Sequence, residues 1–387
     1  MKIVFIANGI LETGGLPAVS GGDIRFVEVG RRWRRAGVEI HVLSSQAGIT
    51  LCRKLGLDAK FHVTDTTGGP ATLAYVKRAL KTHSEKELSK AIIYSTSDLL
   101  CDTFPALRLR RTLRSQWIAT VHWIEELPWQ RGLRLGPAWI DGLLLCLNQR
   151  FSTTLIRRFA DAVLAVSNRT ARQVEDLGIA GERIYSVKCG VDSELINNIT
   201  PDCDRKNYDA CYMKRFHPAK GIFDVIEIWE RVCRQIKDAK LALVGHGPAH
   251  IITQVRKLVA QKNLDGNVDY LGVIYDVEKK IKVLKNSRLF IHPSYEENWA
   301  IVIGEAMACG LPVVAYELPV LRDIWKKGFV GVSVGDLEEF AGRVLDLLKD
   351  HQLYRKTSEE ARHMASKYDW ETVAKEELSI LESLSHD

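Results

Sequence analysis

Short, continuously apolar segments alternate with longer segments of helical periodicity along most of this chain. Stretches such as 23–36 and 170–177 repeat apolar positions every three or four residues, as helices do. Segments that are apolar throughout are typical of parallel strands that are covered by helices on both faces. In the first half of the chain we expect such strands at 3–7, 39–43, 91–94, 117–121, 162–166 and 184–187.

A second alternating set occupies the second half of the chain. Its expected strands are 210–213, 241–244, 268–271, 289–292 and 312–315. Two such sets predict an α/β protein with two doubly wound, Rossmann-like domains. The polar segment 197–207, which contains Pro201, is typical of a linker. We therefore expect domains at 1–196 and 208–369, followed by an amphipathic helix that begins at Trp370.

The positive charge of the chain is unevenly distributed. The formal net charge is +6 over 387 residues, but residues 1–200 hold 27 Lys+Arg against 19 Asp+Glu, a net charge of +8. Basic clusters stand at 31–35 and 108–114. Such a half favours an anionic partner, although a solvated basic surface is the simpler alternative. No nucleic-acid-binding module accompanies the clusters, so we expect phosphate or anionic lipid rather than nucleic acid.

The eight cysteines are scattered and no pair has C-x-x-C spacing. They are typical of reduced thiols in a cytoplasmic protein, neither a disulfide framework nor a zinc site. The N-terminus leads directly into a strand, so we expect no signal peptide. No apolar run approaches the roughly 20 residues of a membrane-spanning helix. We expect a cytoplasmic protein, with the inner membrane face as an alternative location.

Ligands of doubly wound sheets bind beyond the carboxyl ends of the strands, so the loops there carry the candidate chemistry. Gly21 and Gly22 end the loop after the first strand and precede an expected helix. Backbone without Cβ atoms approaches a phosphate closely, and a helix N-terminus offers unpaired N–H groups. A flexible loop with a tight turn is the alternative, because the spacing is not G-x-G-x-x-G.

Two cations follow the first strand of the second domain, Arg215 and Lys220. Arginine offers a planar fork of donors and lysine a compact charge, so together they could clamp a diphosphate. The alternative is two solvated cations on a loop. Their position at a strand end favours the functional interpretation.

The segment 293–310 follows another strand of the second domain and carries two glutamates. We expect a helix over about 299–309, with Glu297 just before it and Glu305 about two turns inside it. A carboxylate accepts two hydrogen bonds well, so each glutamate could hold a vicinal diol. The alternatives are a helix cap for Glu297 and a surface salt bridge for Glu305, but an unpaired carboxylate among small apolar residues is costly.

This pattern resembles the retaining glycosyltransferases of family four, which have the GT-B fold of two Rossmann-like domains facing across a cleft. The resemblance covers nearly the whole chain. It rests on many short motifs in one order, of which the Glu297-to-Glu305 spacing is the most specific. The others are Gly21-Gly22, 165–167, 190–192, Arg215 with Lys220-Gly221, 244–248 with Gly245, and 292–294.

The resemblance implies roles for individual residues. Arg215 and Lys220 would bind the donor diphosphate, Glu297 the transferred sugar and Glu305 the ribose. His122, at the end of a strand, would lie near the sugar and the acceptor; without the resemblance it reads as a hydrogen-bonded loop histidine. The expected helix 370–387 would complete the N-terminal domain. The remaining expected donor-binding residues are Gly21, Gly22, Gly245, Asn298, Trp299, Ala300 and Ile301.

Three positions depart from the family pattern. Asn298 and Ala300 stand where the family usually has glycines, and Lys214 replaces a frequent glycine before Arg215. Alanine is a mild change because the helix amides remain. Asn298 leaves the sugar open, and Lys214 adds positive charge.

The resemblance implies transfer of a hexosyl group from a nucleoside diphosphate sugar to a glycan or lipid-linked acceptor, with retention and without cofactor or metal. The donor base, sugar, acceptor, linkage and oligomeric state stay open. One alternative is a sugar-nucleotide epimerase of the same architecture. Another is a non-catalytic sugar-nucleotide binder.

Two further segments have competing interpretations. The segment 139–158 combines tryptophan and leucines with arginines. It could lie on an anionic membrane surface, although a helix packed on the core is the favoured interpretation. The segment 202–204 superficially resembles a metal-binding D-x-D, but it falls in the expected linker.

Overall fold

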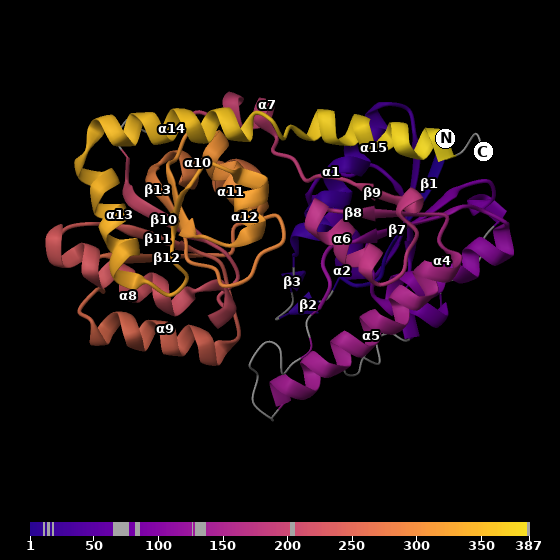
Figure 1. Cartoon of the computed structure of the whole chain (residues 1–387), viewed down its shortest axis with the longest axis horizontal. Helices are drawn as coiled ribbons and strands as arrows, with labels where there is room; N and C mark the ends of the chain where they lie inside the picture. Colours follow the sequence, from indigo (N-terminus) through magenta and orange to yellow (C-terminus); the bar gives the residue numbers. More distant parts are fainter. Residues whose placement is uncertain are drawn as a thin grey trace. The chain divides into compact units, whose positions relative to one another are not determined.

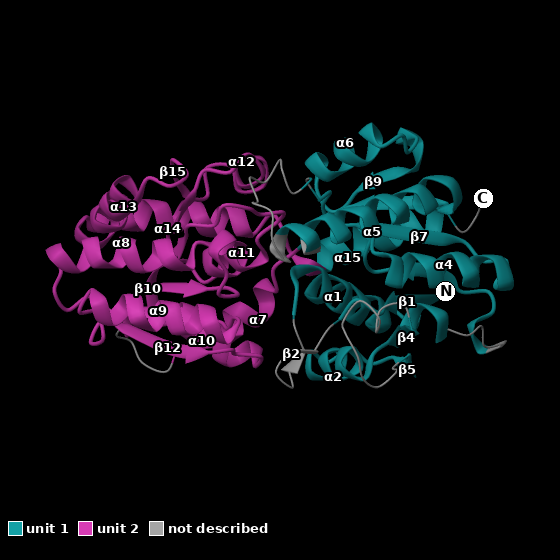
Figure 2. Cartoon of the chain, turned by 90° about the horizontal axis from the view of Figure 1, so that it is seen from below, with its two compact units in different colours: residues 1–189, 371–387 teal, residues 190–370 magenta. Residues whose placement is uncertain are grey.

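The computed structural model describes residues 1–10, 12–13, 16–17, 19–64, 77–81, 86–125, 127, 137–201 and 206–384. The chain forms two compact units, residues 1–189 with 371–387 and residues 190–370 (Figure 2). α7 (Ser193–Asn198) belongs to the second unit, whereas we expected the first domain to continue to 196. The D-x-D-like segment 202–204 lies outside the described residues.

The first unit contains a seven-stranded parallel sheet of order β5-β4-β1-β6-β7-β8-β9. Helices cover both of its faces (Figure 1). Its strands are β1 (Lys2–Ala7), β4 (Glu39–Ser44), β5 (Lys60–Val63), β6 (Ile92–Ser95), β7 (Trp117–Val121), β8 (Ala162–Ala165) and β9 (Ile184–Ser186), beside a hairpin of β2 (Glu12–Thr13) and β3 (Leu16–Pro17). Its helices are α1 (Gly21–Arg35), α2 (Gln46–Lys54), η1 (Lys86–Leu88), α4 (Leu100–Leu113), α5 (Pro137–Phe159), α6 (Asn168–Asp176), η2 (Gly181–Arg183) and α15 (Trp370–Leu384).

A buried ion pair fastens α15 to the first unit. The guanidinium of Arg25 in α1 binds the carboxylate of Glu377 in α15, and both side chains are almost fully buried. Tyr94 Oη donates to Glu377 Oε1 at 2.8 Å, and Arg25 Nε donates to the carbonyl of Lys188 at 3.0 Å. The surrounding core is aromatic, with the rings of Phe5 and Trp33 stacked at 5.8 Å. Because each charge has partners, the polar cluster can be accommodated in an apolar layer.

The second unit contains a six-stranded parallel sheet of order β12-β11-β10-β13-β14-β15. Its strands are β10 (Tyr208–Met213), β11 (Leu241–Val244), β12 (Val268–Gly272), β13 (Ser287–His292), β14 (Val313–Tyr316) and β15 (Val330–Val332). Its helices are α7, η3 (Pro218–Lys220), α8 (Ile222–Gln235), α9 (Ala249–Gln261), α10 (Val277–Lys285), α11 (Ile301–Ala308), α12 (Pro319–Trp325), α13 (Leu337–Lys349) and α14 (His351–Ala365). α8, α9 and α13 bury one face of the sheet, around Trp229 and Phe340.

The order of both sheets reverses at an internal point. In the second unit the chain leaves β10 toward β11 and β12 and then returns to β13 on the other side of β10, where Ala210 pairs with Leu289. In the first unit the same reversal lies between β1 and β6. Loops diverge at such a switch point, which opens a crevice for ligands at the carboxyl ends of the strands. The predicted two doubly wound, Rossmann-like halves are confirmed.

The described residues bear on two expectations from the sequence, that no helix spans a membrane and that the cysteines are reduced. None of the described helices has the length and apolarity to cross a membrane. The seven cysteines within the described ranges are free thiols.

Replacing Glu377 with alanine should strongly destabilise the first unit. The change leaves the Arg25 charge buried and unpaired, which costs about 3–5 kcal/mol. Glu376→Ala is the matched control, because Glu376 forms an exposed pair with Lys188 and such pairs contribute about 0–1 kcal/mol. Urea unfolding measures both, and equal losses in the two variants would contradict the assignment of the buried pair.

Candidate functional site

Two loops meet at the switch point of the second unit. The β10–α8 loop runs from Lys214 through η3 to Gly221, and the β13–α11 loop begins at Pro293. Gly221 has φ +71°, and a Cβ atom there would lie 1.8 Å from the Pro293 carbonyl oxygen. Only glycine allows this approach, so the two loops are held in direct contact.

Glu297 lies at the centre of this contact, and four side chains converge on one of its oxygens. Lys214 Nζ binds Glu297 Oε1. Ser294 Oγ donates to the same oxygen at 2.7 Å, His292 Nε2 lies 3.2 Å from it and Lys220 Nζ lies 3.6 Å from it. No described residue binds the second oxygen, Oε2. The carboxylate is therefore fixed in orientation while one oxygen keeps its capacity to accept hydrogen bonds.

The charges around Glu297 hold it ionised. Burial by itself raises the pKa of this carboxyl group, but the Lys214 charge, the His292 hydrogen bond and the Lys220 charge outweigh burial and keep its pKa well below 4.5. Burial and the Lys214 charge lower the pKa of His292 to about 4, so its imidazole is neutral near pH 7. The groups around the Glu297 carboxylate are thus two lysines, a hydroxyl and a neutral imidazole, and the Glu296 carboxylate lies 3.7 Å from Lys220 Nζ.

Arg215 and Lys220 supply positive charge at the same strand end. Lys220 Nζ donates to the Glu296 carbonyl at 2.7 Å. The Arg215 side chain is exposed and makes no hydrogen bond or ion pair within the described part of the chain. Gly245 after β11 packs on this loop, since a Cβ atom there would lie 1.8 Å from the Lys214 carbonyl oxygen. The loops therefore present unneutralised positive charge to an anionic ligand.

α11 begins later than expected, at Ile301 rather than near Trp299. Ala300 has φ +59° and ψ +62°, a left-handed conformation that ends the loop and costs a residue with a Cβ about 1–2 kcal/mol. Glycine would adopt it freely, which gives a physical reason for the glycine that the resembling family has here.

The Trp299 side chain has a packing role. Its indole is buried against Trp325 and Tyr368, at ring distances of 6.3 and 5.4 Å. Its carbonyl accepts a 2.9 Å hydrogen bond from Trp325 Nε1. A ligand in front of α11 would therefore meet the main chain here, together with the partly exposed side chain of Asn298.

Glu305, expected to bind a ribose, is already paired. Lys280 Nζ donates to Glu305 Oε1 at 2.5 Å, and both side chains are about one fifth exposed or less. The Lys280 charge compensates for the unfavourable desolvation of a carboxylate among small apolar residues. A diol at this position would have to share the carboxylate with Lys280 or displace it.

The expected residues of the first unit also lie together. α1 begins at Gly21, two residues earlier than expected, because Ser20 caps it by accepting from the N–H of Asp23. A Cβ atom on Gly22 would lie 2.7 Å from His122 Nε2, so Gly22 and the histidine are in contact. Burial lowers the pKa of His122 to about 4. Nε2 donates to the Thr96 carbonyl at 2.8 Å, so Nδ1 is the acceptor nitrogen of a neutral ring.

Sequence reasoning did not assign Lys214, His292 or Ser294 to the Glu297 carboxylate. In the sequence, Lys214 indicates only added positive charge, and residues 292–294 indicate only a short family motif. The available signal was their position at the ends of β10 and β13, which the topology brings together. Within the described residues, no group of three or more His, Cys, Asp or Glu could hold a metal ion.

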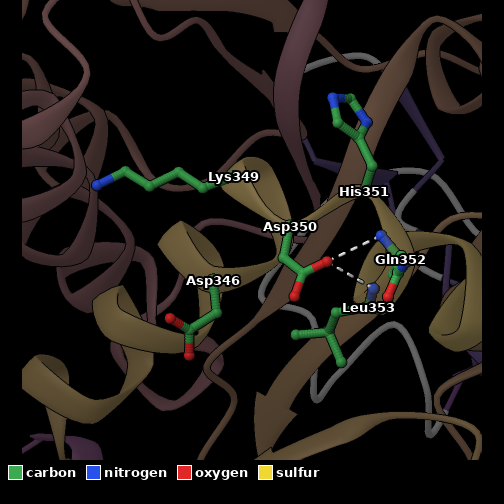
Figure 3. Close-up of a pocket in the computed structure, with 6 residues that line it drawn as sticks. All are labelled: Asp346, Lys349, Asp350, His351, Gln352 and Leu353. Atoms are coloured by element: carbon green, nitrogen blue, oxygen red, sulfur yellow. Dashed lines mark hydrogen bonds between the residues drawn. The ribbon is translucent and has the colours of Figure 1, made fainter.

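A surface pocket lies elsewhere, at the junction of α13 and α14 (Figure 3). Asp350 Oδ1 accepts from the N–H groups of Gln352 and Leu353 at 2.8 and 3.0 Å, and so caps α14. This carboxylate caps the helix, and the pocket lies toward the amino end of β13, where Arg288 Nη2 donates to the Leu348 carbonyl at 2.8 Å, rather than at the carboxyl ends of the strands. Its lining residues are Asp346, Lys349, Asp350, His351, Gln352 and Leu353.

Both halves of the chain match known family models. Residues 19–195 match the model described as Glycosyltransferase Family 4, and residues 201–364 match Glycosyl transferases group 1. The chain is 27% identical over 212 residues to N-acetyl-alpha-D-glucosaminyl L-malate synthase of Bacillus anthracis, covering 52% of this chain and 54% of that protein. It is 26% identical over 230 residues to phosphatidyl-myo-inositol mannosyltransferase of Mycolicibacterium smegmatis, covering 57% of each. The matched region spans little more than half the length of these relatives.

Solved structures show the same fold. HepE of Anabaena in complex with UDP and glucose has a TM-score of 0.77 at 20% identity, over 99% of this chain and 100% of that chain. Sucrose-phosphate synthase of Thermosynechococcus elongatus has a TM-score of 0.79 at 18% identity, over 99% and 98% of the two chains.

Replacing Lys214 with methionine should raise the pKa of Glu297, because burial remains while the largest opposing charge is lost. A carboxyl group with a depressed pKa stabilises the folded chain above its ordinary pKa of 4.5, and this stabilisation is lost as the pH falls toward the depressed value. In the methionine variant this stabilisation should therefore be smaller, and it should be lost at a higher pH than in wild type. Carbon-13 NMR titration of glutamate carboxyls measures the shift. Lys214→Arg keeps the charge and serves as control; an unchanged titration in the methionine variant would disprove the pairing.

Proposed function

The chain belongs to the glycosyltransferases described as family 4 and group 1, and we propose that it moves a hexosyl group from a nucleoside diphosphate sugar to a glycan or lipid-linked acceptor. The observation that carries this proposal is the cluster at the switch point of the second unit. A buried, oriented carboxylate and exposed positive charge lie there side by side. A sugar joined to a diphosphate needs both.

In this proposal Lys220 and Arg215 bind the diphosphate. Lys220 lies between the carbonyl of Glu296 and the Glu297 carboxylate, which keeps it at the strand end. The N–H groups at the start of α11 add partial positive charge that suits a phosphate. These groups would stabilise the negative charge that develops on the departing diphosphate, the task a metal ion performs in other enzymes. We therefore propose transfer without a metal or cofactor.

Glu297 would bind the sugar through Oε2. Its Oε1 already accepts from Lys214 and Ser294, so the carboxylate cannot rotate without losing those contacts. A hydroxyl of the sugar can donate to Oε2 with little reorganisation, which favours correct positioning. His122 of the first unit keeps the role that the resemblance implies, near the sugar and the acceptor.

The proposed transfer retains the anomeric configuration. The bond between the anomeric carbon and the phosphate oxygen breaks, and the acceptor oxygen forms the new bond on the same face. The acceptor hydroxyl passes its proton to the departing phosphate oxygen, so the step needs no protein nucleophile. The chain contributes positioning and charge stabilisation.

We propose a uridine nucleotide as the first donor to test and leave the sugar open. HepE was solved with UDP-glucose, whereas the named relatives are a glucosaminyl and a mannosyl enzyme. The phosphatidyl-myo-inositol enzyme is named for a lipid acceptor, which keeps a lipid-linked acceptor in the proposal. The Asn298 side chain, where the family has glycine, is a candidate determinant of the sugar.

The experiment that tests this function pairs donor binding with product analysis. A thermal-shift screen of nucleoside diphosphate sugars should identify one donor, because a ligand bound to the folded state alone stabilises it. That donor is then incubated with glycan and lipid-linked acceptors, and products are analysed by mass spectrometry and NMR. Glycosylated acceptor with retained configuration supports the proposal. An epimerised sugar nucleotide as sole product, or binding without turnover of any acceptor, would replace it with the epimerase or the binder.

Lys220→Ala should weaken binding of the nucleoside diphosphate about tenfold or more, since hydrogen bonds to charged groups contribute about 1.5–3 kcal/mol. Transfer should slow as well. Lys237→Ala is the control, because this exposed lysine lies between α8 and β11, at the amino end of a strand. Calorimetry of nucleoside diphosphate measures both variants, and equal affinity for wild type and Lys220→Ala would remove Lys220 from the site.

Glu305→Ala should weaken nucleoside diphosphate binding more than binding of a sugar phosphate that lacks the nucleoside. The proposed partner of Glu305 is the ribose, which only the first ligand carries. Lys280→Ala separates this role from loss of the ion pair, because it also breaks the pair but leaves the carboxylate. Equal weakening of both ligands by Glu305→Ala would reject the ribose contact.

A further inference from the structure

The outer face of α5 carries an apolar stripe that the fold leaves uncovered. Ile140, Leu144, Leu147 and Phe151 are 54%, 54%, 54% and 58% exposed. Their spacing of four, three and four residues places them on one side of the helix. At 1.5 Å per residue the stripe is roughly 16 Å long. In Figure 1 the amino-terminal half of α5 extends beyond the sheet of its unit.

The opposite side of α5 accounts for its packing. Cys146, Gln149, Ser152 and Ile156 are buried. Gln149 Nε2 donates to the Trp123 carbonyl at 2.7 Å and its Oε1 accepts from the N–H of Glu125 at 2.7 Å. These contacts fix which side of the helix faces the domain. The outer apolar side chains are therefore surplus to the core, and such patches mark interaction sites.

Positive charge flanks the stripe. Arg150, Arg157 and Arg158 on α5 are exposed. Arg111 of α4 and Arg158 both lie over the ring of Phe159, at 4.8 and 5.8 Å, so basic residues of both helices gather at the carboxyl end of α5. An apolar stripe beside arginines is complementary to a surface that is apolar inside and anionic outside, as a bilayer of anionic lipids is.

We propose that α5 docks in the plane of an anionic lipid bilayer, with its apolar stripe inserted among the acyl chains and its arginines at the headgroups. The patch is too small for a stable dimer: four side chains that are a little over half exposed offer a few hundred Å², against roughly 800 Å² per partner in a standard interface. A spanning mode is not available to the described helices.

Lipid binding by this surface can be measured without the transfer reaction, because none of its residues belongs to the candidate donor site. The favoured sequence interpretation, a helix packed on the core, describes only its inner side. Docking would hold the enzyme at the surface where a lipid-linked acceptor resides. The anionic bilayer would then be a partner of the enzyme that we propose.

The experiment measures co-sedimentation of the full chain with vesicles. Wild type should bind vesicles of equal phosphatidylcholine and phosphatidylglycerol, bind pure phosphatidylcholine much more weakly, and lose binding as salt rises. The double variant Leu147→Asp/Phe151→Asp should bind the anionic vesicles at least about tenfold more weakly, because it removes two apolar side chains from the acyl region. Val334→Asp changes an equally exposed apolar residue of the second unit and should bind as wild type does.

Thermal melting shows whether each variant is folded. Binding of nucleoside diphosphate shows whether the donor site is intact, so a loss of lipid binding can be told apart from a failure of the proposed function. Absence of binding to anionic vesicles, or undiminished binding by the double variant, would overturn the proposal. So would a concentration-dependent dimer in wild type that the double variant abolishes, since the stripe would then be a self-interface.

Discussion

The candidate site depends on one electrostatic constraint, a buried carboxylate that must be neutralised at the end of two adjacent strands. Glu297 would be unfavourable in its position without nearby cations. Lys214 from the loop after β10 supplies the closest charge, and Lys220 from the same loop supplies a second. Pairing with these lysines holds the two loops together. It leaves the carboxylate ionised, fixed in orientation and able to accept hydrogen bonds through Oε2. The proposed chemistry uses those three properties.

The backbone around the cluster is shaped to make this pairing possible. Gly221 and Gly245 allow main chain to approach main chain at distances that any Cβ atom would prevent. Ala300 accepts a left-handed conformation in order to begin α11 where it does. Strain of this kind persists where surrounding structure imposes it, and it is common at ligand sites. The first unit also contains a buried charge that must be neutralised. There Arg25 and Glu377 are buried together, and their pairing holds α15 to the rest of the unit.

Much of the fold could be predicted because most strands are buried on both faces and are therefore continuously apolar. β7 and β11 match their predicted bounds. β5 was missed because Lys60 and His62 interrupt its apolar pattern at the edge of the sheet, and β15 because it is short. The start of α11 could not be read from propensity, since it depends on one backbone conformation at Ala300. The residues of the candidate site were named from motifs, but their contacts are non-local: the partner of Glu297 lies 83 positions away, and Glu305 is held by Lys280 from another helix.

The most direct measurement is a crystal structure of the chain with a nucleoside diphosphate sugar bound. We expect the diphosphate within hydrogen-bonding distance of Lys220 or Arg215 at the start of α11. We also expect a sugar hydroxyl to donate to Glu297 Oε2 while Oε1 keeps its contacts with Lys214 and Ser294. A nucleotide bound away from the ends of β10 and β13, with the Glu297 cluster untouched, would contradict it.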